Sequence, residues 1–485
     1  MRSILSVLNF LGSLLALFAL YFVPPIATAA AYGEHALVGF LAGAGVSGAL
    51  GLLLRAATRR YRGTLKPRDG YLLVSAIWPV IAAVATIPLL VDLPGLSFTD
   101  AFFETMSGVS TTGATILSGL DALPRSVILW RHALSWLGGM GVIVLAVAVL
   151  PLLGIGGMQI HRAETPGGIK DFTLAPRIAE TARLLWFVYA ALTAACFAAL
   201  WGAGMTPFDA LCHALSTLAL GGFSTHDANI AWFDSPRIEF VLVVFMLLAA
   251  MNFTTHFLAL RRGDLKLYAR DPEARWLLAW IGASCIGVAL HVWLSGAYPS
   301  YLATLRHVGF SVVSFATGGG FVGADYDHWP VFAPMWMLLL SCVCASTGST
   351  GGGIKMFRSL VLVKQSLREM FTLVHPQAVL PLKVAGNVVP NRVVYAVLAF
   401  IFLYFMAIAV LTFSLLISGL DFVSAFSAVI ACVNNVGAGL GAVGPHASYA
   451  SLSDFQTWVC ALAMFVGRIE IITFVVLFTP TFWRK

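Results

Sequence analysis

Long apolar stretches bounded by polar or charged residues recur along almost the whole chain. Ten of these stretches reach the length of roughly 20 residues that a helix needs to cross a bilayer. Their approximate bounds are 4–31, 36–54, 71–93, 127–153, 184–203, 238–260, 276–297, 332–362, 391–419 and 456–482. The pattern therefore predicts about ten transmembrane helices, with both chain ends on the same side of the membrane.

Four shorter apolar segments lie between the predicted spans, and they are too short to cross a membrane. They fall near 98–112, 205–219, 302–317 and 421–435. A helix that stops inside a bilayer leaves backbone groups unpaired unless protein or a water-filled cavity surrounds its end. We therefore expect four re-entrant helices within an all-α polytopic membrane protein.

Each short segment runs into a turn of small residues that contains glycine. We call these segments turn 1 to turn 4; they cover 110–115, 219–224, 317–321 and 434–439. They align on Gly113, Gly222, Gly320 and Gly437, and six residues earlier stand Ser107, Ser216, Ser314 and Ala431. A recurrence near every 100 residues predicts four copies of one larger unit.

The repeats divide the chain into five parts. Residues 1–62 form two extra N-terminal transmembrane helices. Each repeat then contains a span, a re-entrant helix, a glycine turn and a second span, and the repeats cover 63–175, 176–268, 269–385 and 386–485. The connections near 155–183 and 363–391 leave room only for short helices. Four turns can surround one axis, which predicts pseudo-fourfold symmetry around a central pore.

Composition and charge agree with a membrane protein. Of the 485 residues, 59% are hydrophobic and 11% are charged, so lipid is an expected partner. The net charge of +7 does not indicate nucleic acid, because 24 Lys and Arg fall on one side of the ten-span topology. The opposite side has four, namely Arg125, Arg131, Arg237 and Arg306. The positive-inside rule then makes both termini cytoplasmic.

Catalytic chemistry is not indicated. The chain offers no His/Glu metal cluster and no nucleophile–base pair, so we expect no enzyme and no organic cofactor. The seven cysteines lie mostly in apolar segments and are expected to pack as small hydrophobic side chains. His256 is expected to be a structural histidine with satisfied hydrogen bonds, the alternative being a proton relay.

The turns have the composition of a cation filter. They carry Gly, Ser, Thr and Ala and no acidic residue. A cation that loses water needs replacement oxygens, and backbone carbonyls supply them without a formal charge. Glycine allows the backbone conformations that aim carbonyls at one axis. Asp100 and Asp209 suit the N-terminal ends of the short helices before turns 1 and 2.

The turns resemble those of the Trk/Ktr/HKT superfamily of potassium uptake proteins, most closely the membrane subunit of bacterial Trk systems. The residues that carry the resemblance include 110–115, 221–225, 434–437, Arg468–Ile471 and the ending 478–484. The resemblance covers the whole chain. It implies potassium uptake across a bacterial inner membrane, homodimers of such chains, and a cytoplasmic TrkA-like ring that binds NAD(H) or ATP/ADP.

The resemblance also assigns carbonyl ligands for K⁺, the transported ion. They are Thr111, Thr112, Gly113, Leu220, Gly221, Gly222, Gly318, Gly319, Gly320, Asn435, Val436 and Gly437. Leu220 and Gly318–Gly319 stand where the family often has threonine, so lost hydroxyls are expected to weaken discrimination between ions. Sodium-conducting relatives tend to replace the first filter glycine with serine, and Gly113 is intact.

Two features are expected beneath the turns. Arg468 lies in the middle of the last span, where a charge must face protein or water. The resemblance places it in the pore as a barrier to cations, and the alternative is a structural pair with Glu470 or another polar group. The second feature is the segment 345–353, here called the glycine loop, whose glycines are Gly348, Gly351, Gly352 and Gly353.

The glycine loop should interrupt its span, because glycine costs about 1 kcal/mol per residue relative to alanine in a helix. It lacks the Gly-Lys-Ser/Thr ending of a phosphate-binding loop. By resemblance it is an intramembrane gating loop, whereas the counterpart 137–141 in repeat 1 is expected to be a packing site. The ring would pull on a basic surface that includes Arg261, Arg262, Lys355 and Arg358. The leading interpretation is a gated channel, and the alternative is a carrier that couples K⁺ to H⁺ or Na⁺.

Overall fold

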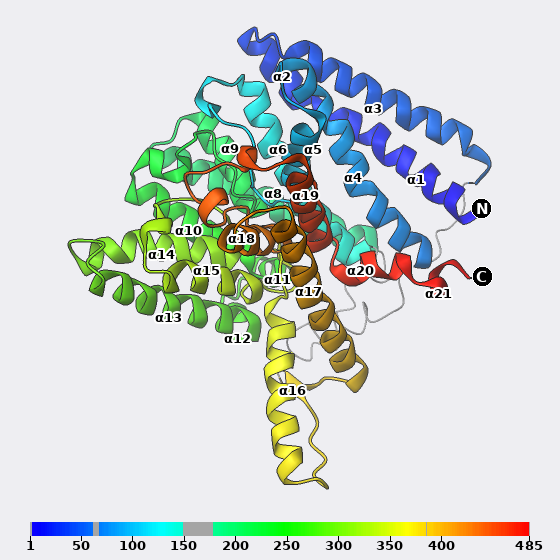
Figure 1. Cartoon of the computed structure of the whole chain (residues 1–485). Coiled ribbons are helices and arrows are strands. Elements are labelled where there is room, and N and C mark those ends of the chain that lie inside the picture. Colours follow the sequence, from blue (N-terminus) through cyan, green and yellow to red (C-terminus); the bar gives the residue numbers. More distant parts are fainter. Residues whose placement is uncertain (1, 62–66, 149–177, 385, 485) are drawn as a thin grey trace.

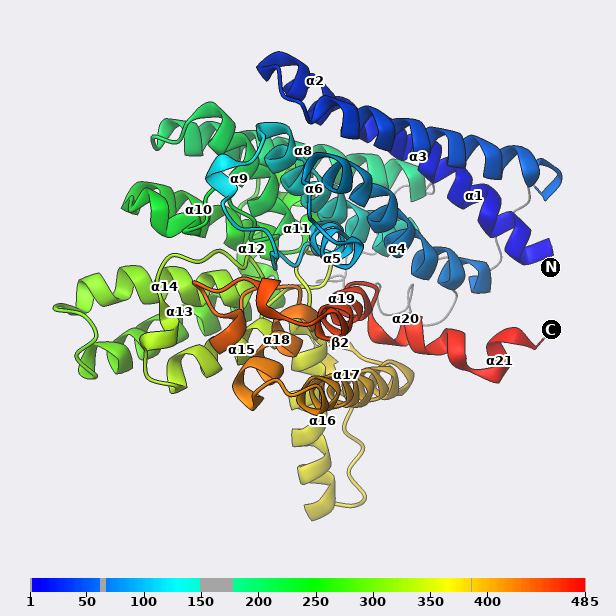
Figure 2. The same ribbon diagram turned by 45° about the horizontal axis from the view of Figure 1, so that its top comes forward.

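The computed structural model describes residues 2–61, 67–148, 178–384 and 386–484. Within these ranges the chain is almost entirely helical, with one two-stranded hairpin. The helices gather around a common centre in Figure 1, and α16 (Met356–Val374) extends away from the rest of the molecule. The N- and C-termini lie on the same side in both views (Figures 1 and 2).

The N-terminal helices form a hairpin at one edge of the molecule. They are α1 (Arg2–Phe18), η1 (Ala19–Phe22), α2 (Val23–Tyr32) and α3 (Leu37–Ala57). α1 and α3 pack closely at Gly12 and Gly51, where a Cβ on Gly12 would stand 2.8 Å from the carbonyl oxygen of Gly51. Figure 2 shows the pair running alongside α4.

Beyond this hairpin the chain repeats one order of elements four times. A long helix comes first: α4 (Pro67–Asp92), α8 (Ile178–Gly202), α13 (Pro272–Leu294) and α17 (Asn391–Ile417). A short helix follows: α5 (Phe98–Val109), α9 (Pro207–Ala219), α14 (Tyr301–Thr317) and α18 (Phe422–Val433). After each glycine turn comes a second helix: α6 (Arg125–Ala148), α10 (Pro236–Ala250), α15 (Phe332–Val343) and α19 (Asp454–Arg468).

Smaller elements connect these helices. The remaining α-helices are α11 (Phe253–Arg262), α12 (Lys266–Arg270), α20 (Ile471–Val475) and α21 (Pro480–Trp483). The 3₁₀ turns are η2 (Arg59–Tyr61), η3 (Leu120–Ala122), η4 (Asn229–Phe233), η5 (Tyr326–His328), η6 (Gly441–Val443), η7 (Tyr449–Ser451) and η8 (Val476–Phe478). The strands β1 (Lys383–Val384) and β2 (Asn387–Val388) pair antiparallel, with Lys383 opposite Val388.

An all-helical membrane protein is confirmed, with fewer uninterrupted spans than expected. Within the described ranges, six helices are long and apolar enough to cross a membrane, or eight if each of two bent pairs is one span. The predicted span 332–362 is divided between α15 and α16, and the interruption at the glycine loop was predicted from its glycines.

Two of the predicted continuous spans are in fact bent. The span 238–260 breaks between α10 and α11 with a bend of 99°. There the side chain of Asn252 accepts a hydrogen bond from the amide of Thr254 and begins a new helix. The span 456–482 bends by 106° between α19 and the segment from Ile471. Glu470, at this bend, has a φ of 60°, which is incompatible with a continuous right-handed helix.

The connection 363–391 also differs from the prediction. It was expected to hold only short helices, but α16 has 19 residues and the β1–β2 hairpin follows it. Residues near the start of α16, such as Phe357 and Val361, are buried, which secures the helix to the rest of the protein. The predicted repeat boundaries at 62, 175 and 385, and most of the connection 155–183, lie outside the described residues.

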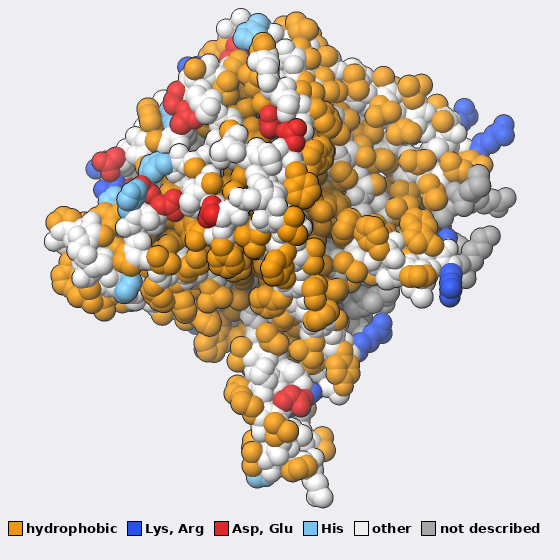
Figure 3. Space-filling view, in the orientation of Figure 1, with side chains coloured by type: hydrophobic (Ala, Val, Ile, Leu, Met, Phe, Trp, Pro, Cys, Tyr) orange, Lys and Arg blue, Asp and Glu red, His pale blue; other side chains and the backbone are white. Residues whose placement is uncertain are grey.

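The surface reflects the predicted charge asymmetry. Figure 3 shows hydrophobic side chains over most of this face of the molecule. Most visible Lys and Arg side chains lie toward the side of the two termini, whereas most acidic and histidine side chains lie on the opposite side. An apolar surface between two polar ends is the arrangement that a bilayer requires.

Candidate functional site

The N-termini of all four short helices are capped by polar side chains. Ser97, Thr206, Ser300 and Asp421 each accept a hydrogen bond from a backbone amide of the first helical turn. Hydrogen bonds from Ser424 lower the pKa of Asp421, so this cap stays anionic. Asp100 and Asp209 lie in the first turns of α5 and α9, as predicted. Negative charge there stabilises the positive end of the helix dipole.

The C-termini of the short helices share one hydrogen-bonded motif. The amide just before each aligned glycine donates to the carbonyl five residues earlier, at 2.7 to 2.9 Å. The pairs are Thr112 to Ser107, Gly221 to Ser216, Gly319 to Ser314 and Val436 to Ala431. A second bond links Thr111 to Gly108, Leu220 to Thr217, Gly318 to Phe315 and Asn435 to Cys432. Together these bonds form a Schellman motif, which ends a helix on a left-handed residue.

The backbone follows one path through all four turns. The left-handed residues are Thr111 (φ 58°), Leu220 (56°), Gly318 (84°) and Asn435 (55°). The aligned glycines two positions later also have a positive φ: Gly113 (81°), Gly222 (63°), Gly320 (70°) and Gly437 (83°). This conformation costs a residue with a side chain about 1–2 kcal/mol. Such strain persists only where surrounding structure fixes the backbone, as at functional sites.

The four turns contact one another in a closed ring. A Cβ added to Gly113 would overlap the carbonyl oxygen of Gly221, and one on Gly222 would lie 3.0 Å from that of Gly319. The series continues in order around the ring. A Cβ on Gly320 would overlap the carbonyl oxygen of Val436, and a Cβ on Gly437 would overlap the carbonyl oxygen of Thr112. Each glycine therefore faces the carbonyls of the next turn, with no room for a side chain.

The four turns of this ring also contain backbone oxygens that accept no hydrogen bond from the residues that the structure describes. Within the described residues, no hydrogen bond occupies the carbonyl oxygens of the four left-handed residues Thr111, Leu220, Gly318 and Asn435. All four residues are buried. An unpaired carbonyl away from water is unfavourable, whereas a set of carbonyls around an axis can replace the hydration shell of a cation.

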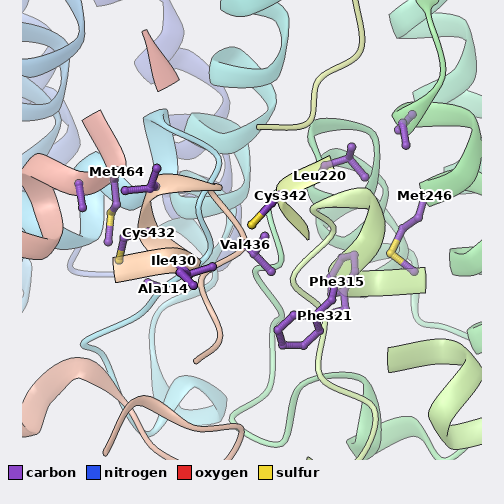
Figure 4. Close-up of a cluster of buried hydrophobic side chains, with 14 of the residues drawn as sticks. Ala114, Leu220, Met246, Phe315, Phe321, Cys342, Ile430, Cys432, Val436 and Met464 are labelled. Carbon is purple, nitrogen blue, oxygen red and sulfur yellow. The ribbon is translucent and has the colours of Figure 1, made fainter. Parts of the chain in front are cut away.

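Apolar packing supports the ring from behind. One buried hydrophobic cluster includes Ala114, Leu220, Phe321 and Val436, which come from turns 1 to 4 respectively. Figure 4 shows these side chains together with neighbours such as Met246 from α10. Because a packed interior resists small displacements, the cluster holds the four turns at fixed spacing.

Two residues that sequence reasoning missed join neighbouring turns. Asn229 donates to the carbonyl of Gly222 at 3.2 Å and accepts from the amide of Val322 at 3.3 Å, which links turn 2 to the residue that follows turn 3. Tyr449 donates through its hydroxyl to the carbonyl of Gly437 at 2.8 Å, and its amide donates to turn 1 at 2.9 Å. Both lie in irregular segments beyond the turns, where no local pattern marks them.

The glycine loop lies against the ends of two short helices. A Cβ on Gly351 would lie 2.9 Å from the carbonyl oxygen of Thr317, and one on Gly352 would overlap that of Asn434. Thr317 and Asn434 immediately precede the left-handed residues of turns 3 and 4. The loop is also fixed at its start, where Glu273 accepts a hydrogen bond of 2.7 Å from the amide of Thr347.

Arg468 is buried and contacts this loop. Its guanidinium donates to the carbonyl oxygens of Thr350 at 2.8 Å and Gly138 at 2.9 Å. Glu470, one of the partners considered from the sequence, instead forms an ion pair of 2.7 Å with Arg358. Gly138 belongs to the segment 137–141, and a Cβ there would overlap the carbonyl of Val109. That segment is therefore the predicted packing site, and it also provides an acceptor for Arg468.

The predicted basic surface is wrong at two positions. Lys355 is buried, and its Nζ donates to the carbonyl oxygen of Gly351 in the glycine loop. Arg358 pairs with Glu470 and lies over the ring of Phe400 at 4.2 Å. Both follow a glycine run that folds inward, which carries them into the protein instead of out to solvent.

His256 is a structural histidine, as expected. One ring nitrogen contacts the hydroxyl of Tyr268 at 2.8 Å, and the other contacts the carbonyl of Leu248 at 2.8 Å. The cysteines also match the prediction: all seven are free thiols, and all except Cys285 are buried.

Comparisons with known proteins agree with this geometry. Residues 39–485 match the family described as "TrkH: Cation transport protein". The chain is 45% identical over 487 residues to the Trk system potassium uptake protein TrkH of Vibrio parahaemolyticus, and the match covers 99% of each chain. It is 43% identical to TrkH of Escherichia coli K12, covering 99% of each chain, and 39% identical to TrkG of the same organism, covering 98% and 97%. The crystal structure of the potassium transporter TrkH from V. parahaemolyticus matches with a TM-score of 0.91 and 42% identity, over 99% of this chain and 100% of that one.

Proposed function

This chain belongs to the TrkH family of cation transport proteins, and on that premise we propose that it is the ion-conducting subunit of a Trk-type potassium uptake system. It is a multi-pass membrane protein and a transporter, not an enzyme. In the proposal it lies in a bacterial inner membrane with both termini in the cytoplasm. Its four repeats and two extra N-terminal helices then amount to about ten transmembrane elements around one pore, including the bent ones.

The observation that carries the proposal is the closed ring of four turns with its unpaired carbonyls. Thr111, Leu220, Gly318 and Asn435 are buried, and their carbonyl oxygens accept no hydrogen bond within the described part of the chain. Carbonyls attract a cation without the full charge that would hold it too tightly for conduction. The partially negative C-termini of four short helices add to the same attraction.

The proposed ligands are the carbonyls at and just before the aligned glycines. In turn 1 they are Thr111, Thr112 and Gly113, and in turn 2 Leu220, Gly221 and Gly222. In turn 3 they are Gly318, Gly319 and Gly320, and in turn 4 Asn435, Val436 and Gly437. The carbonyls of Gly222 and Gly437 already accept hydrogen bonds from Asn229 and Tyr449, and those of Gly221 and Val436 accept from backbone amides two residues later. A carbonyl oxygen has a second lone pair for an ion.

The threonine hydroxyls absent at Leu220 and Gly318–Gly319 bear on selectivity. In turn 1 the Thr112 hydroxyl contacts Ser110 at 2.7 Å and accepts from the Asn435 side chain at 2.9 Å, which stiffens the contact between turns 1 and 4. Leu220 offers only apolar packing, and its Cδ1 would lie 3.5 Å from a Cβ on Gly351. We therefore expect potassium selectivity to depend on packing around turns 2 and 3.

The glycine loop is the proposed gate. It lies against the ends of α14 and α18, and Arg468 and Lys355 bind its consecutive carbonyls at Thr350 and Gly351. A loop with Gly348, Gly351, Gly352 and Gly353 has many accessible backbone states once those contacts are released. A homodimer and a cytoplasmic TrkA-like ring that binds NAD(H) or ATP/ADP are proposed as the assembly that moves it.

The decisive experiment is the reversal potential of the purified protein in planar bilayers or liposomes. A K⁺ channel reverses at the K⁺ equilibrium potential whatever proton or sodium gradient is imposed. If the reversal potential instead shifts with pH or with the Na⁺ gradient, the protein is a secondary transporter that couples K⁺ to H⁺ or Na⁺. Absence of any K⁺ flux, with and without the nucleotide-binding partner, would contradict both functions.

A further inference from the structure

A buried ion pair stands behind turns 1 and 2. The Nε of Arg131, on α6, lies 2.6 Å from the Oε1 of Glu104, on α5, and their side chains are 2% and 1% exposed. Glu104 also accepts hydrogen bonds of 3.0 Å from the amide of Ile116 and from the hydroxyl of Thr115. Its carboxylate therefore holds the segment in which turn 1 ends.

The guanidinium of Arg131 reaches the neighbouring turn. One nitrogen donates to the carbonyl of Ser224 at 3.5 Å, and the guanidinium carbon lies 4.4 Å from the centre of the Phe223 ring. Another nitrogen donates to the Thr115 hydroxyl at 3.0 Å. Phe223 and Ser224 directly follow Gly222, the aligned glycine of turn 2. The ion pair thus spans the junction of the two turns.

Stability alone does not account for a charged pair in this position. Removing two charges from water is costly, and an apolar pair of similar volume is often as stable or more stable. The junctions between turns 2 and 3 and between turns 4 and 1 are joined by the neutral side chains of Asn229 and Tyr449. What the charged pair adds is directional, charge-assisted hydrogen bonds that fix one geometry.

We propose that Arg131 and Glu104 are positioning residues for ion selectivity. The inference rests on the proposed function, and it assigns the pair the task of fixing the spacing between the carbonyls of turns 1 and 2. Arg131 is one of the four basic residues that the charge pattern assigned to the outer side of the membrane, and it is buried against the turns. In the cavity-size account of selectivity, K⁺ is preferred to the smaller Na⁺ because the carbonyl oxygens keep a fixed distance from the axis.

The test measures the K⁺/Na⁺ permeability ratio from reversal potentials under bi-ionic conditions, on the full chain in liposomes. The variants are Arg131→Lys, which keeps the charge but loses the planar set of donors, and Glu104→Gln, which keeps the shape but loses the charge. We expect each to lower the ratio by about tenfold, as the loss of a charge-assisted hydrogen bond would. The ratio comes only from conducting molecules, so it does not report how much protein is folded.

The matched control is a second Arg–carboxylate cluster outside the turns. Arg306, on α14, pairs with Glu239 at 2.7 Å and with Asp234 at 2.8 Å. Arg306→Lys should leave the permeability ratio within about twofold of the unaltered protein, since distant sites act independently. A similar loss of selectivity in this control would mean that any arginine pair matters, which would overturn the assignment.

The outcomes separate this inference from the proposed function. If the unaltered protein does not conduct K⁺ selectively, the function fails before the variants are tested. If it does, and both variants conduct with an unchanged ratio, the inference is wrong and the function stands. Should the single variants not fold, Glu104→Leu combined with Arg131→Met replaces the pair by apolar groups. That double variant decides the case, because a full K⁺/Na⁺ ratio in it would exclude a positioning role.

Discussion

The guanidinium of Arg468 donates a hydrogen bond of 2.8 Å to the carbonyl oxygen of Thr350, inside the glycine loop. The two residues lie in different repeats, so this bond joins the bend at the end of α19 to the loop between α15 and α16. A second nitrogen of Arg468 donates to Gly138 in repeat 1. Arg468 therefore anchors the loop, and in the proposed function it also places a positive charge beneath the turns.

Replacing Arg468 with alanine should raise basal potassium flux by about tenfold, because the loop loses a charge-assisted hydrogen bond and the pathway loses a positive charge. Arg468→Lys keeps the charge and should have a smaller effect. Flux into liposomes and melting temperature would be measured on the same preparations. Lower flux together with a lower melting temperature would indicate that Arg468 is only a structural partner.

Lys355 also holds the glycine loop, because its Nζ donates a hydrogen bond to the carbonyl oxygen of Gly351, the residue after Thr350. Lys355→Met keeps the aliphatic stem and removes the donor to Gly351. We expect basal flux to rise several-fold, and the double variant with Arg468→Ala to conduct more than either single variant. Single-channel recording would give the open probability of each. If the double variant conducts no more than Arg468→Ala, the two cations do not both hold the loop.

A substitution at Gly352 tests whether the glycine loop is the gate, by displacing the loop sterically. A Cβ at this position would overlap the carbonyl oxygen of Asn434, so Gly352→Ala should push the loop away from α18 and raise basal flux. Gly282→Ala in α13 is the control, since a Cβ there meets nothing within 4 Å. The K⁺/Na⁺ ratio should stay unchanged in both. A change in that ratio for Gly352→Ala would instead favour gating within the turns themselves.

A substitution at Gly113 tests whether the ring of turns determines ion selectivity. Gly113→Ser should reduce discrimination against sodium by about tenfold or more, because the side chain would overlap the carbonyl of Gly221 and displace turn 2. Gly119→Ser is a matched control: Gly119 also has a positive φ, of 70°, but a Cβ there meets nothing within 4 Å. Comparing K⁺, Rb⁺ and Na⁺ fluxes of the two variants separates overlap from backbone strain. An unaltered ion series in Gly113→Ser would exclude turn 1 from the filter.

The sequence was most informative where function constrains the backbone directly. The aligned glycines are visible as a long-period repeat, and the structure accounts for them. Each has a positive φ, which glycine adopts most readily, and each faces a neighbouring turn that leaves no room for a side chain. Because the same requirement recurs in all four turns, it leaves a pattern in the sequence.

The bend at Glu470 and the burial of Lys355 were not visible because contacts distant in sequence accompany them. Apolar stretches such as 456–482 read as continuous helices, and nothing nearby reveals that Glu470 pairs with Arg358 across 112 residues. In the same way, the loop that carries Lys355 inward is held by Glu273, 74 residues earlier in the same repeat, and by Arg468 from repeat 4. A single sequence predicts the secondary-structure elements but not which of them contact one another.

The closed ring of four unlike turns has a consequence for inheritance. In a pore made from four identical chains, one codon change alters every quarter of the pathway at once. In the filter proposed here each quarter is encoded separately, and Thr111, Leu220, Gly318 and Asn435 already differ in side chain while keeping one backbone conformation. A mutation then alters a single quarter, so the proposed function predicts that ion preference can be tuned in small, asymmetric steps during evolution or design.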